Sequence, residues 1–210
     1  MPAHRSTVKP RAASARSRAF ELVTFGASAG GIEVLHGLLA ALPKDFAPAV
    51  MIVVHLPPDP PSYLVQSFSH RCALPVIEPD AHEQILGGRV YVAPPGYHLM
   101  VESDRTVALS TEAAVRFSRP SIDVMFESAA WVYRERLLAI LLSGANEDGV
   151  RGLATVRSLG GHTWAQDPDT ASSPEMPRAA IERGVVDDVL TPSSIAQSLV
   201  GLPASIDQPA

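Results

Sequence analysis

The segment 26–31 reads Gly-Ala-Ser-Ala-Gly-Gly and follows the apolar run 22–25, so Ser28 lies between a predicted strand and a predicted helix. A strand-to-helix turn of the type Gly-x-Ser-x-Gly exposes a serine oxygen at the end of a sheet. It also brings backbone N–H groups of the helix start beside that oxygen, where they stabilise negative charge. Two kinds of site share this local structure, a nucleophile elbow and a phosphate-binding loop.

A histidine and an aspartate follow two further predicted strands. His55 follows the apolar run 49–54, and Asp148 lies in the polar segment after the apolar run 137–142. Runs without polar alternation are typical of parallel strands that are buried on both faces. Because ligands bind beyond the carboxyl ends of such strands, we expect Ser28, His55 and Asp148 to meet at one edge of the sheet. A serine that attacks, a histidine that moves the proton and a carboxylate that orients the histidine form a hydrolase triad.

Each of these three residues also has a structural interpretation. Ser28 and Asp148 are of types favoured at helix N-termini, and each lies just before a predicted helix. His55 can be a boundary histidine whose hydrogen bonds are satisfied within the fold. These separate interpretations do not account for the occurrence of all three residues at one sheet edge, which favours the triad.

A nucleotide site is the competing enzymatic interpretation. Gly26, Ser28 and Gly31 have the spacing of Gly-x-Gly-x-x-Gly, but serine replaces the glycine that lets the backbone approach a pyrophosphate. That fingerprint also needs an acidic residue at the end of the second strand, where this chain has His55. The order serine, histidine, aspartate differs from that of lipase-type α/β-hydrolases, in which the acid precedes the histidine. The sequence therefore favours a serine hydrolase of another kind.

The elements that would position these residues alternate between strands and helices. Strands are predicted at 22–25, 49–54, 76–77, 90–93, 99–102, 107–109, 137–142 and 163–165. Helices are predicted at 31–41, 62–70, 122–134, 149–159, 177–182 and 194–202. This alternation indicates a three-layer, doubly wound α/β fold with a mostly parallel sheet. The turn-rich stretch from 90 to 109 predicts a short antiparallel meander that forms a sheet edge or a flap.

The composition narrows the class of protein. A chain of 210 residues with 46% hydrophobic residues can build a substantial core, and its net charge of −5 does not favour nucleic acid as a partner. No apolar run reaches the roughly 20 residues of a membrane span. Cys72 is the only cysteine, which excludes a disulfide framework and favours a reducing, cytoplasmic location. We expect no metal and no cofactor, because ligand-like spacing is missing among His36, His70, His82, His98 and His162.

The chain ends differ in composition from the part between them. Five basic residues precede the first acidic one, so we expect a disordered basic arm at 1–20. We expect a frayed tail at 204–210 and one domain at 21–203. Such an arm is far shorter than a domain.

Seven separated segments, in this order, carry a resemblance to a known family: 26–31, 54–58, 91–98, 119–126, 142–149, 165–167 and 176–181. Over about residues 21–200 the chain resembles the catalytic domain of the chemotaxis protein-glutamate methylesterase, CheB. The resemblance implies a nucleophile at Ser28, a base at His55 and an acid at Asp148. It also implies hydrolysis of glutamate methyl esters on the cytoplasmic helices of chemoreceptors, release of methanol, and deamidation of certain receptor glutamines. No nucleic acid and no membrane insertion are implied.

The resemblance extends to the residues around the triad, with departures. The family commonly has Gly-Met-Gly-(Ala/Asn)-Asp-Gly at the acid loop, where this chain has Gly-Ala-Asn-Glu-Asp-Gly at 144–149. Ala145 matches the methionine whose backbone N–H contributes to the oxyanion site, a role that does not depend on the side chain. Ala29 replaces the usual threonine after the nucleophile, and Glu175 replaces a glycine. Arg119 and Met176 are candidate substrate contacts, with a loop arginine and a packing methionine as the alternatives.

Family members commonly carry an N-terminal receiver domain, and only about 20 residues precede the first predicted strand here. We therefore expect a stand-alone esterase or a separated catalytic part, without control by phosphorylation within this chain. The alternative is a catalytically weak CheB-like module that binds receptor helices or a signalling partner.

Overall fold

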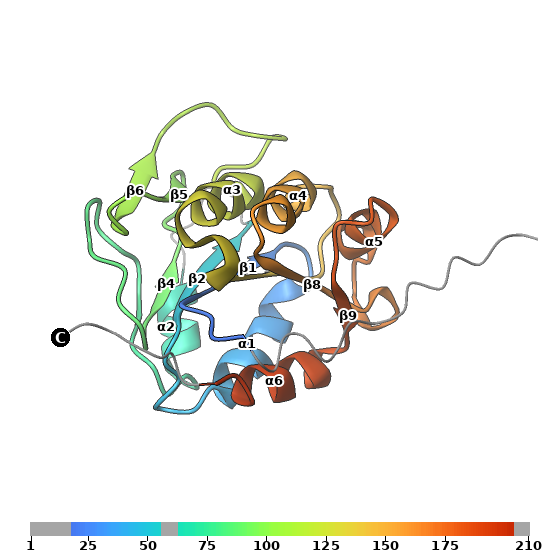
Figure 1. Cartoon of the computed structure of the whole chain (residues 1–210), viewed down its shortest axis with the longest axis horizontal. Coiled ribbons are helices and arrows are strands. Elements are labelled where there is room, and N and C mark those ends of the chain that lie inside the picture. The colour runs from blue at the N-terminus through green and yellow to red at the C-terminus, as the bar shows by residue number, and fades with distance from the viewer. Residues whose placement is uncertain (1–17, 56–62, 204–210) are drawn as a thin grey trace, which may run out of the picture.

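The computed structural model describes residues 18–55 and 63–203. The centre of the fold is a sheet of seven parallel strands, whose place among the helices is seen in Figure 1. The strand order is β3-β4-β2-β1-β7-β8-β9. The sheet consists of β1 (Leu22–Ala27), β2 (Ala49–Val54), β3 (Val76–Ile77), β4 (Val90–Val92), β7 (Leu137–Leu141), β8 (His162–Gln166) and β9 (Asp188–Leu190). A separate antiparallel hairpin consists of β5 (His98–Val101) and β6 (Val107–Ser110).

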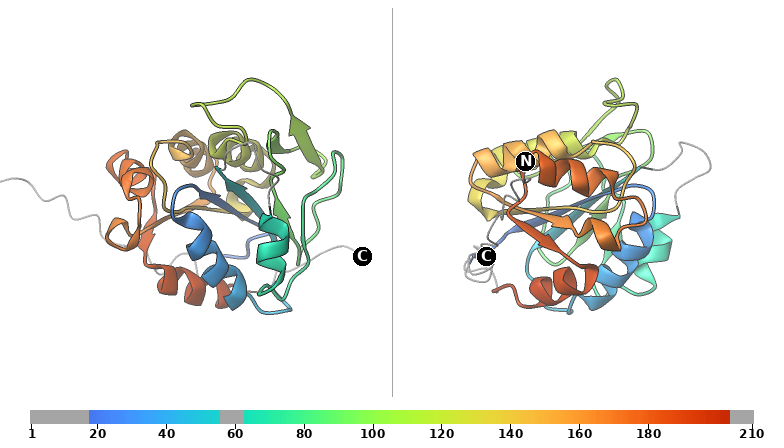
Figure 2. Two further views of the ribbon diagram at one scale, coloured as in Figure 1. Left: turned by 180° about the vertical axis from the view of Figure 1, so that it is seen from behind. Right: turned by 90° about the vertical axis from the view of Figure 1, so that its right-hand side faces the viewer.

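Helices cover both faces of this sheet, which makes the three-layer fold that the sequence predicted (Figures 1 and 2). One face carries α1 (Gly31–Ala41), α2 (Leu64–Ser69) and α6 (Pro192–Val200). The other face carries α3 (Ile122–Tyr133), α4 (Val150–Ser158) and α5 (Glu175–Glu182), with the β5–β6 hairpin beside α3. Short 3₁₀ turns are η2 (Arg134–Arg136) and η3 (Pro168–Thr170).

The central strands are continuous apolar runs because each face of the sheet lies under a layer of helices. In β2, Val50 and Ile52 pack into the core beneath α1 and α6, whereas Met51 and Val53 pack into the core beneath α3 and α4. All four side chains are fully buried. Successive side chains of β2 therefore enter two apolar cores, and the strand has no polar face. This explains why its sequence does not alternate between apolar and polar residues.

One prediction of secondary structure was wrong, and one strand was not predicted. β4 does not belong to an antiparallel meander, because it pairs in parallel with β2 and β3 inside the main sheet. The Pro94-Pro95-Gly96 turn ends this strand and leads to the separate β5–β6 hairpin instead. No strand was predicted at β9, a segment of three residues that begins with Asp188. That acid is accommodated in the sheet because its carboxylate receives a hydrogen bond of 2.8 Å from His162 Nε2.

The predicted basic arm falls almost entirely on residues 1–17, and the predicted tail falls on 204–210. Residues 1–17 of the arm and the whole tail lie outside the described residues. The domain boundaries at 21 and 203 stay predictions.

Candidate active site

The first strand lies between the second and the seventh, so the chain order reverses on either side of β1. Ala27 pairs with Val54, which places Ser28 and His55 at adjacent positions just beyond the carboxyl ends of β1 and β2. His55 N donates to Ala27 O at 3.0 Å, and Ser28 N donates to Ser143 O at 2.9 Å. The loops after β1, β2 and β7 therefore meet at the position where doubly wound sheets bind their ligands.

Ser28 is not the N-cap of α1. The capping position is Gly30, with a φ of 77°, and the cap has no side-chain hydrogen bond. Ser28 contributes its carbonyl oxygen to the turn by accepting from Gly31 N at 2.9 Å. Its hydroxyl is partly exposed and forms no hydrogen bond with any described residue. The interpretation of Ser28 as a plain helix cap is therefore wrong, and its side chain is free to react.

The histidine and the aspartate are joined directly. His55 Nε2 lies 2.8 Å from Asp148 Oδ2, and the aspartate is fully buried. Asn146 flanks this pair: its Nδ2 lies 3.4 Å from His55 Nδ1, and its Oδ1 accepts from Asp148 N at 3.0 Å. Among the described residues no hydrogen bond joins His55 to Ser28. A long or absent bond between nucleophile and base is common in a structure without substrate.

The carboxylate of Asp148 lies at the N-terminus of α3. Its Oδ2 accepts from Ile122 N at 2.7 Å, and its Oδ1 accepts from Ser121 Oγ at 2.9 Å and from Asp123 N at 3.0 Å. Ser121 is the N-cap of that helix. A carboxylate at this place satisfies helix N–H groups that have no partner within the helix and lies at the positive end of the helix dipole.

These donors decide the charge of Asp148. Burial alone would raise its pKa, but the hydrogen bonds from His55 and from the backbone of Asp123 and Ile122 outweigh burial and lower the pKa below its ordinary value. The group is therefore ionised at neutral pH. The other interpretation of Asp148, as the cap of the helix that follows it, is wrong because Gly149 occupies the N-cap of α4 without a side-chain hydrogen bond.

Two backbone N–H groups near Ser28 are without an acceptor in the described part of the chain, those of Ala29 and Ala145. Ala29 follows Ser28 directly. Ala145 follows Gly144, where an added Cβ would come within 2.9 Å of Ser28 Cβ. The loop after β7 thus packs against the nucleophile turn, and free donors from both loops are near the serine, as an oxyanion site requires.

The two candidate substrate contacts differ in their surroundings. Arg119 is exposed and lines a pocket of about 280 Å³ together with His55 and Phe117. Its guanidinium donates to Thr111 O at 2.8 Å and to Glu112 O at 3.0 Å, so it also holds its own loop.

Met176 is fully buried and packs under the acid loop. A Cβ added to Gly144 would meet its Cε at 2.5 Å, and its backbone N–H donates to Gly144 O at 2.9 Å. The prediction of a substrate contact at Met176 is therefore corrected, because the side chain has no exposed surface to offer and supports the loop from beneath.

Three residues of the site were missed by sequence reasoning: Asn146, Ser121 and His98. Asn146 was seen only as part of a loop pattern. Ser121 carries the signal of a helix N-cap, but nothing in the sequence says which distant carboxylate its helix receives. His98 is buried, accepts from Ser121 N at 3.1 Å through Nδ1 and donates to Ala113 O at 3.2 Å through Nε2. It holds the loop before α3, whose N-terminus in turn holds Asp148.

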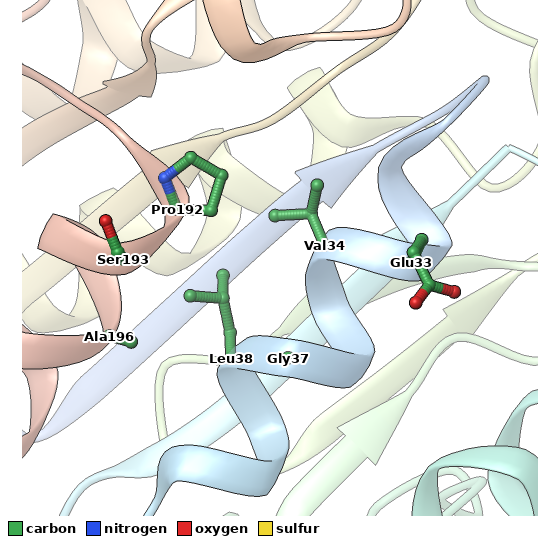
Figure 3. A pocket seen from close by; sticks show the side chains of 7 residues that line it. All are labelled: Glu33, Val34, Gly37, Leu38, Pro192, Ser193 and Ala196. Carbon is green, nitrogen blue, oxygen red and sulfur yellow. The ribbon is translucent and has the colours of Figure 1, made fainter.

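A second pocket, of about 320 Å³, lies between α1 and α6 (Figure 3). It is lined mainly by small or apolar residues such as Val34, Leu38, Pro192 and Ala196. Without a cluster of reactive side chains it is not a candidate active site. Across 18–55 and 63–203, no group of three or more histidines, cysteines or acids is placed to hold a metal ion, and no helix is long and apolar enough to cross a membrane.

Comparison with known proteins gives consistent matches. A family model described as CheB methylesterase matches residues 23–199. A Leptospira interrogans protein, whose name assigns it provisionally as a protein-glutamate methylesterase/protein-glutamine glutaminase, is 41% identical over 87% of this chain and 95% of its own length. Protein-glutamate methylesterase/protein-glutamine glutaminase 2 of Pseudomonas aeruginosa is 39% identical over 86% of this chain, which spans 52% of that protein.

A solved structure, the catalytic domain of the CheB methylesterase from Thermotoga maritima, matches with a TM-score of 0.82 at 30% identity. The match covers 87% of this chain and 98% of that domain. The chain thus spans nearly all of the Leptospira relative and about half of the longer Pseudomonas protein.

Proposed function

The chain belongs to the CheB methylesterase family, and on this premise we propose that it is a serine hydrolase that demethylates glutamate methyl esters on the cytoplasmic helices of chemoreceptors. The products are methanol and a glutamate side chain, and the same site deamidates receptor glutamines. The reaction takes place in the cytoplasm. The observation that carries this proposal is the 2.8 Å bond between His55 and the buried Asp148, directly beside Ser28 at the switch point of the sheet.

In the first half of the proposed reaction, Ser28 Oγ attacks the ester carbonyl and its proton passes to His55. The negative charge that develops on the carbonyl oxygen is stabilised by the N–H groups of Ala29 and Ala145, which are without an acceptor in the described structure. His55 then gives its proton to the departing methoxide, so methanol leaves and an acyl-serine remains.

In the second half, His55 takes a proton from water, which attacks the acyl-serine. The bond to Ser28 Oγ breaks, the serine regains its proton from His55, and the glutamate carboxylate is released. Asp148 stays ionised throughout, because the helix N–H groups keep its pKa low, and its charge stabilises the imidazolium that forms twice in the cycle. For a glutamine substrate the leaving group is ammonia, and the steps are otherwise the same.

The proposal is tested by measuring methanol release from methylated receptor fragments. We expect Ser28→Ala and His55→Ala each to lose roughly 10⁴-fold in rate, and the double variant to be no slower than either, since the two residues act as a unit. A matched control is Ser69→Ala, which removes an exposed hydroxyl whose hydrogen bond is to Val65 O within α2. Near-native release by Ser28→Ala would contradict the assignment of Ser28 as the nucleophile. Wild-type release no faster than that of Ser28→Ala would favour the alternative, a weakly active module that binds receptor helices.

A further inference from the structure

Asn146 forms a bridge between the base and the acid of the site. One end of its side-chain amide faces His55 Nδ1 at 3.4 Å, and the other end faces the backbone N of Asp148 at 3.0 Å. The side chain is partly exposed, in the same loop as Ala145. It occupies the side of the imidazole ring that the carboxylate of Asp148 leaves open.

The chemistry of these partners indicates which nitrogen of the His55 ring carries the proton. A backbone N–H only donates, so the Asn146 atom that faces Asp148 N is the oxygen, and the amide nitrogen faces the ring. An amide nitrogen also only donates, so His55 Nδ1 is an acceptor without a proton. Asp148 is ionised and only accepts, so His55 Nε2 carries the proton. The resting imidazole is therefore the Nε2–H form, and its basic nitrogen is Nδ1.

The arrangement also holds the ring in place. A single hydrogen bond from Nε2 to Asp148 leaves the imidazole free to swing about that bond, and the amide restrains it from the opposite side. At 3.4 Å the contact with Asn146 is long for an N–H···N bond, so little is lost when a hydroxyl takes its place at Nδ1. The amide can therefore orient the base without blocking it.

We propose that Asn146 is a positioning residue, which sets the protonation form and the orientation of His55 so that Nδ1 receives the proton of Ser28. The proposal rests on the proposed function in one respect, that His55 acts as the base.

Two substitutions separate positioning from a merely structural role. Asn146→Asp keeps an oxygen for the backbone N–H of Asp148 but replaces the amide donor by a carboxylate, which holds a proton on Nδ1 and so occupies the base. Asn146→Ala removes both interactions. If Asn146 served only the loop, the Asp variant would behave as wild type and the Ala variant would be impaired.

We expect both variants to lower kcat by about tenfold or more, with KM within about twofold, and the Asp variant to be at least as impaired as the Ala variant. A matched control is Glu147→Gln in the same loop, whose exposed carboxylate pairs with Arg116 and Arg183 at 3.6 Å and faces no ring nitrogen. Its kcat should stay within about twofold of wild type. A wild-type kcat in Asn146→Asp, or a rise in KM at constant kcat, would overturn the proposal.

A second measurement needs no turnover. ¹H–¹⁵N correlation spectra of the imidazole distinguish a protonated ring nitrogen from a bare one, and we expect His55 in the wild type to be protonated at Nε2 and bare at Nδ1. In Asn146→Asp, Nδ1 should become protonated at the same pH. A wild-type His55 protonated at Nδ1 would contradict the inference, whereas failure to hydrolyse methyl esters would count only against the proposed function.

Discussion

Two buried carboxylates lie side by side at the start of α3, but they differ in their hydrogen-bond partners and in the direction of their pKa shifts. Asp148 and Asp123 are both fully buried, and Gly149 N donates to both, at 3.1 Å and 2.9 Å. Asp148 receives donors at both oxygens. Asp123 receives Gly149 N and Gly152 N at Oδ1, whereas its Oδ2 has no hydrogen-bond partner among the described residues.

The pKa values of the two groups follow this difference. Burial raises the pKa of Asp123 above its ordinary value, since the hydrogen bond from Gly152 N and the nearby Arg151 do not compensate and the charge of Asp148 adds to the rise. For Asp148 the donors outweigh burial, and its pKa falls. Burial is thus common to both carboxylates. The number of hydrogen-bond donors at each oxygen decides which carboxylate has the lower pKa and stays ionised. We propose that Asp148, which lies 2.8 Å from His55 Nε2 and has the lowered pKa, is the catalytic carboxylate.

The largest expected effect is the contrast between two amide substitutions. Asp148→Asn should lower turnover by roughly 10⁴-fold in a folded protein, because the amide neither holds the Nε2–H form of His55 nor stabilises the imidazolium. Asp123→Asn should stay within about threefold, because an amide oxygen can still accept from Gly149 N and Gly152 N. Methanol release measures both. Equal losses in the two variants would break the distinction between the carboxylates.

Gly149→Ala tests the donor that the two carboxylates share. Gly149 has a φ of 96°, and an added Cβ would meet Leu141 Cδ1 at 2.6 Å and Ile122 Cγ2 at 2.7 Å. Backbone strain and overpacking should together lower the free energy of unfolding by about 2–4 kcal/mol. The matched control is Gly37→Ala, where a Cβ meets nothing within 4 Å inside helix α1. That variant should gain about 0.5–1 kcal/mol. Urea unfolding measures both, and an unaffected Gly149→Ala protein would show that this junction is not tightly held.

The smallest expected effect is the pH dependence of stability. A carboxyl whose pKa is raised on folding costs stability as the pH rises through the window above its unfolded pKa of about 3.9. Ionised Asp123 should therefore weaken the wild type at pH 7 relative to pH 4. Asp123→Asn removes this cost, so its Tm relative to wild type should be higher at pH 7 than at pH 4. The opposite trend would mean that Arg116 and Arg151, at 3.9 Å and 3.8 Å, dominate.

Asp148 has the opposite sign. Its lowered pKa contributes stability above about pH 3.9, and that contribution is lost as the pH falls through the folded pKa. Below pH 4 the Tm of wild type should therefore fall more steeply than that of Asp148→Asn, which thermal unfolding across this pH range measures. Parallel curves of Tm against pH for the two proteins would contradict the lowered pKa of Asp148.

The sequence predicted the parts of this site that follow from the backbone. Uninterrupted apolar runs identify buried parallel strands, and the carboxyl ends of such strands share one edge, so Ser28, His55 and Asp148 could be placed together without coordinates. The layers of helices followed from the same alternation. The partners of Asp148 at the start of α3 could not be predicted, because they depend on how a loop and a helix from different parts of the chain are packed.

The sequence also could not predict the role of side chains when that role depends on the direction in which the side chain points. Asn146 and Glu147 are adjacent polar residues of one loop, and only the geometry shows that the first faces the imidazole and the second faces arginines. Met176 lies in a family motif near the site, and only packing shows that it is buried beneath Gly144. β4 was assigned to the wrong sheet because turn residues indicate where a strand ends, not which strand it pairs with.

The central claim is that Ser28 is a nucleophile activated by His55. It is tested most directly by reaction with a fluorophosphonate probe, followed by mapping of the labelled peptide. We predict that the probe labels Ser28 alone in the wild type, that His55→Ala slows labelling by orders of magnitude, and that Ser28→Ala is not labelled. Labelling at another residue, or labelling of Ser28 at the wild-type rate in His55→Ala, would contradict the claim.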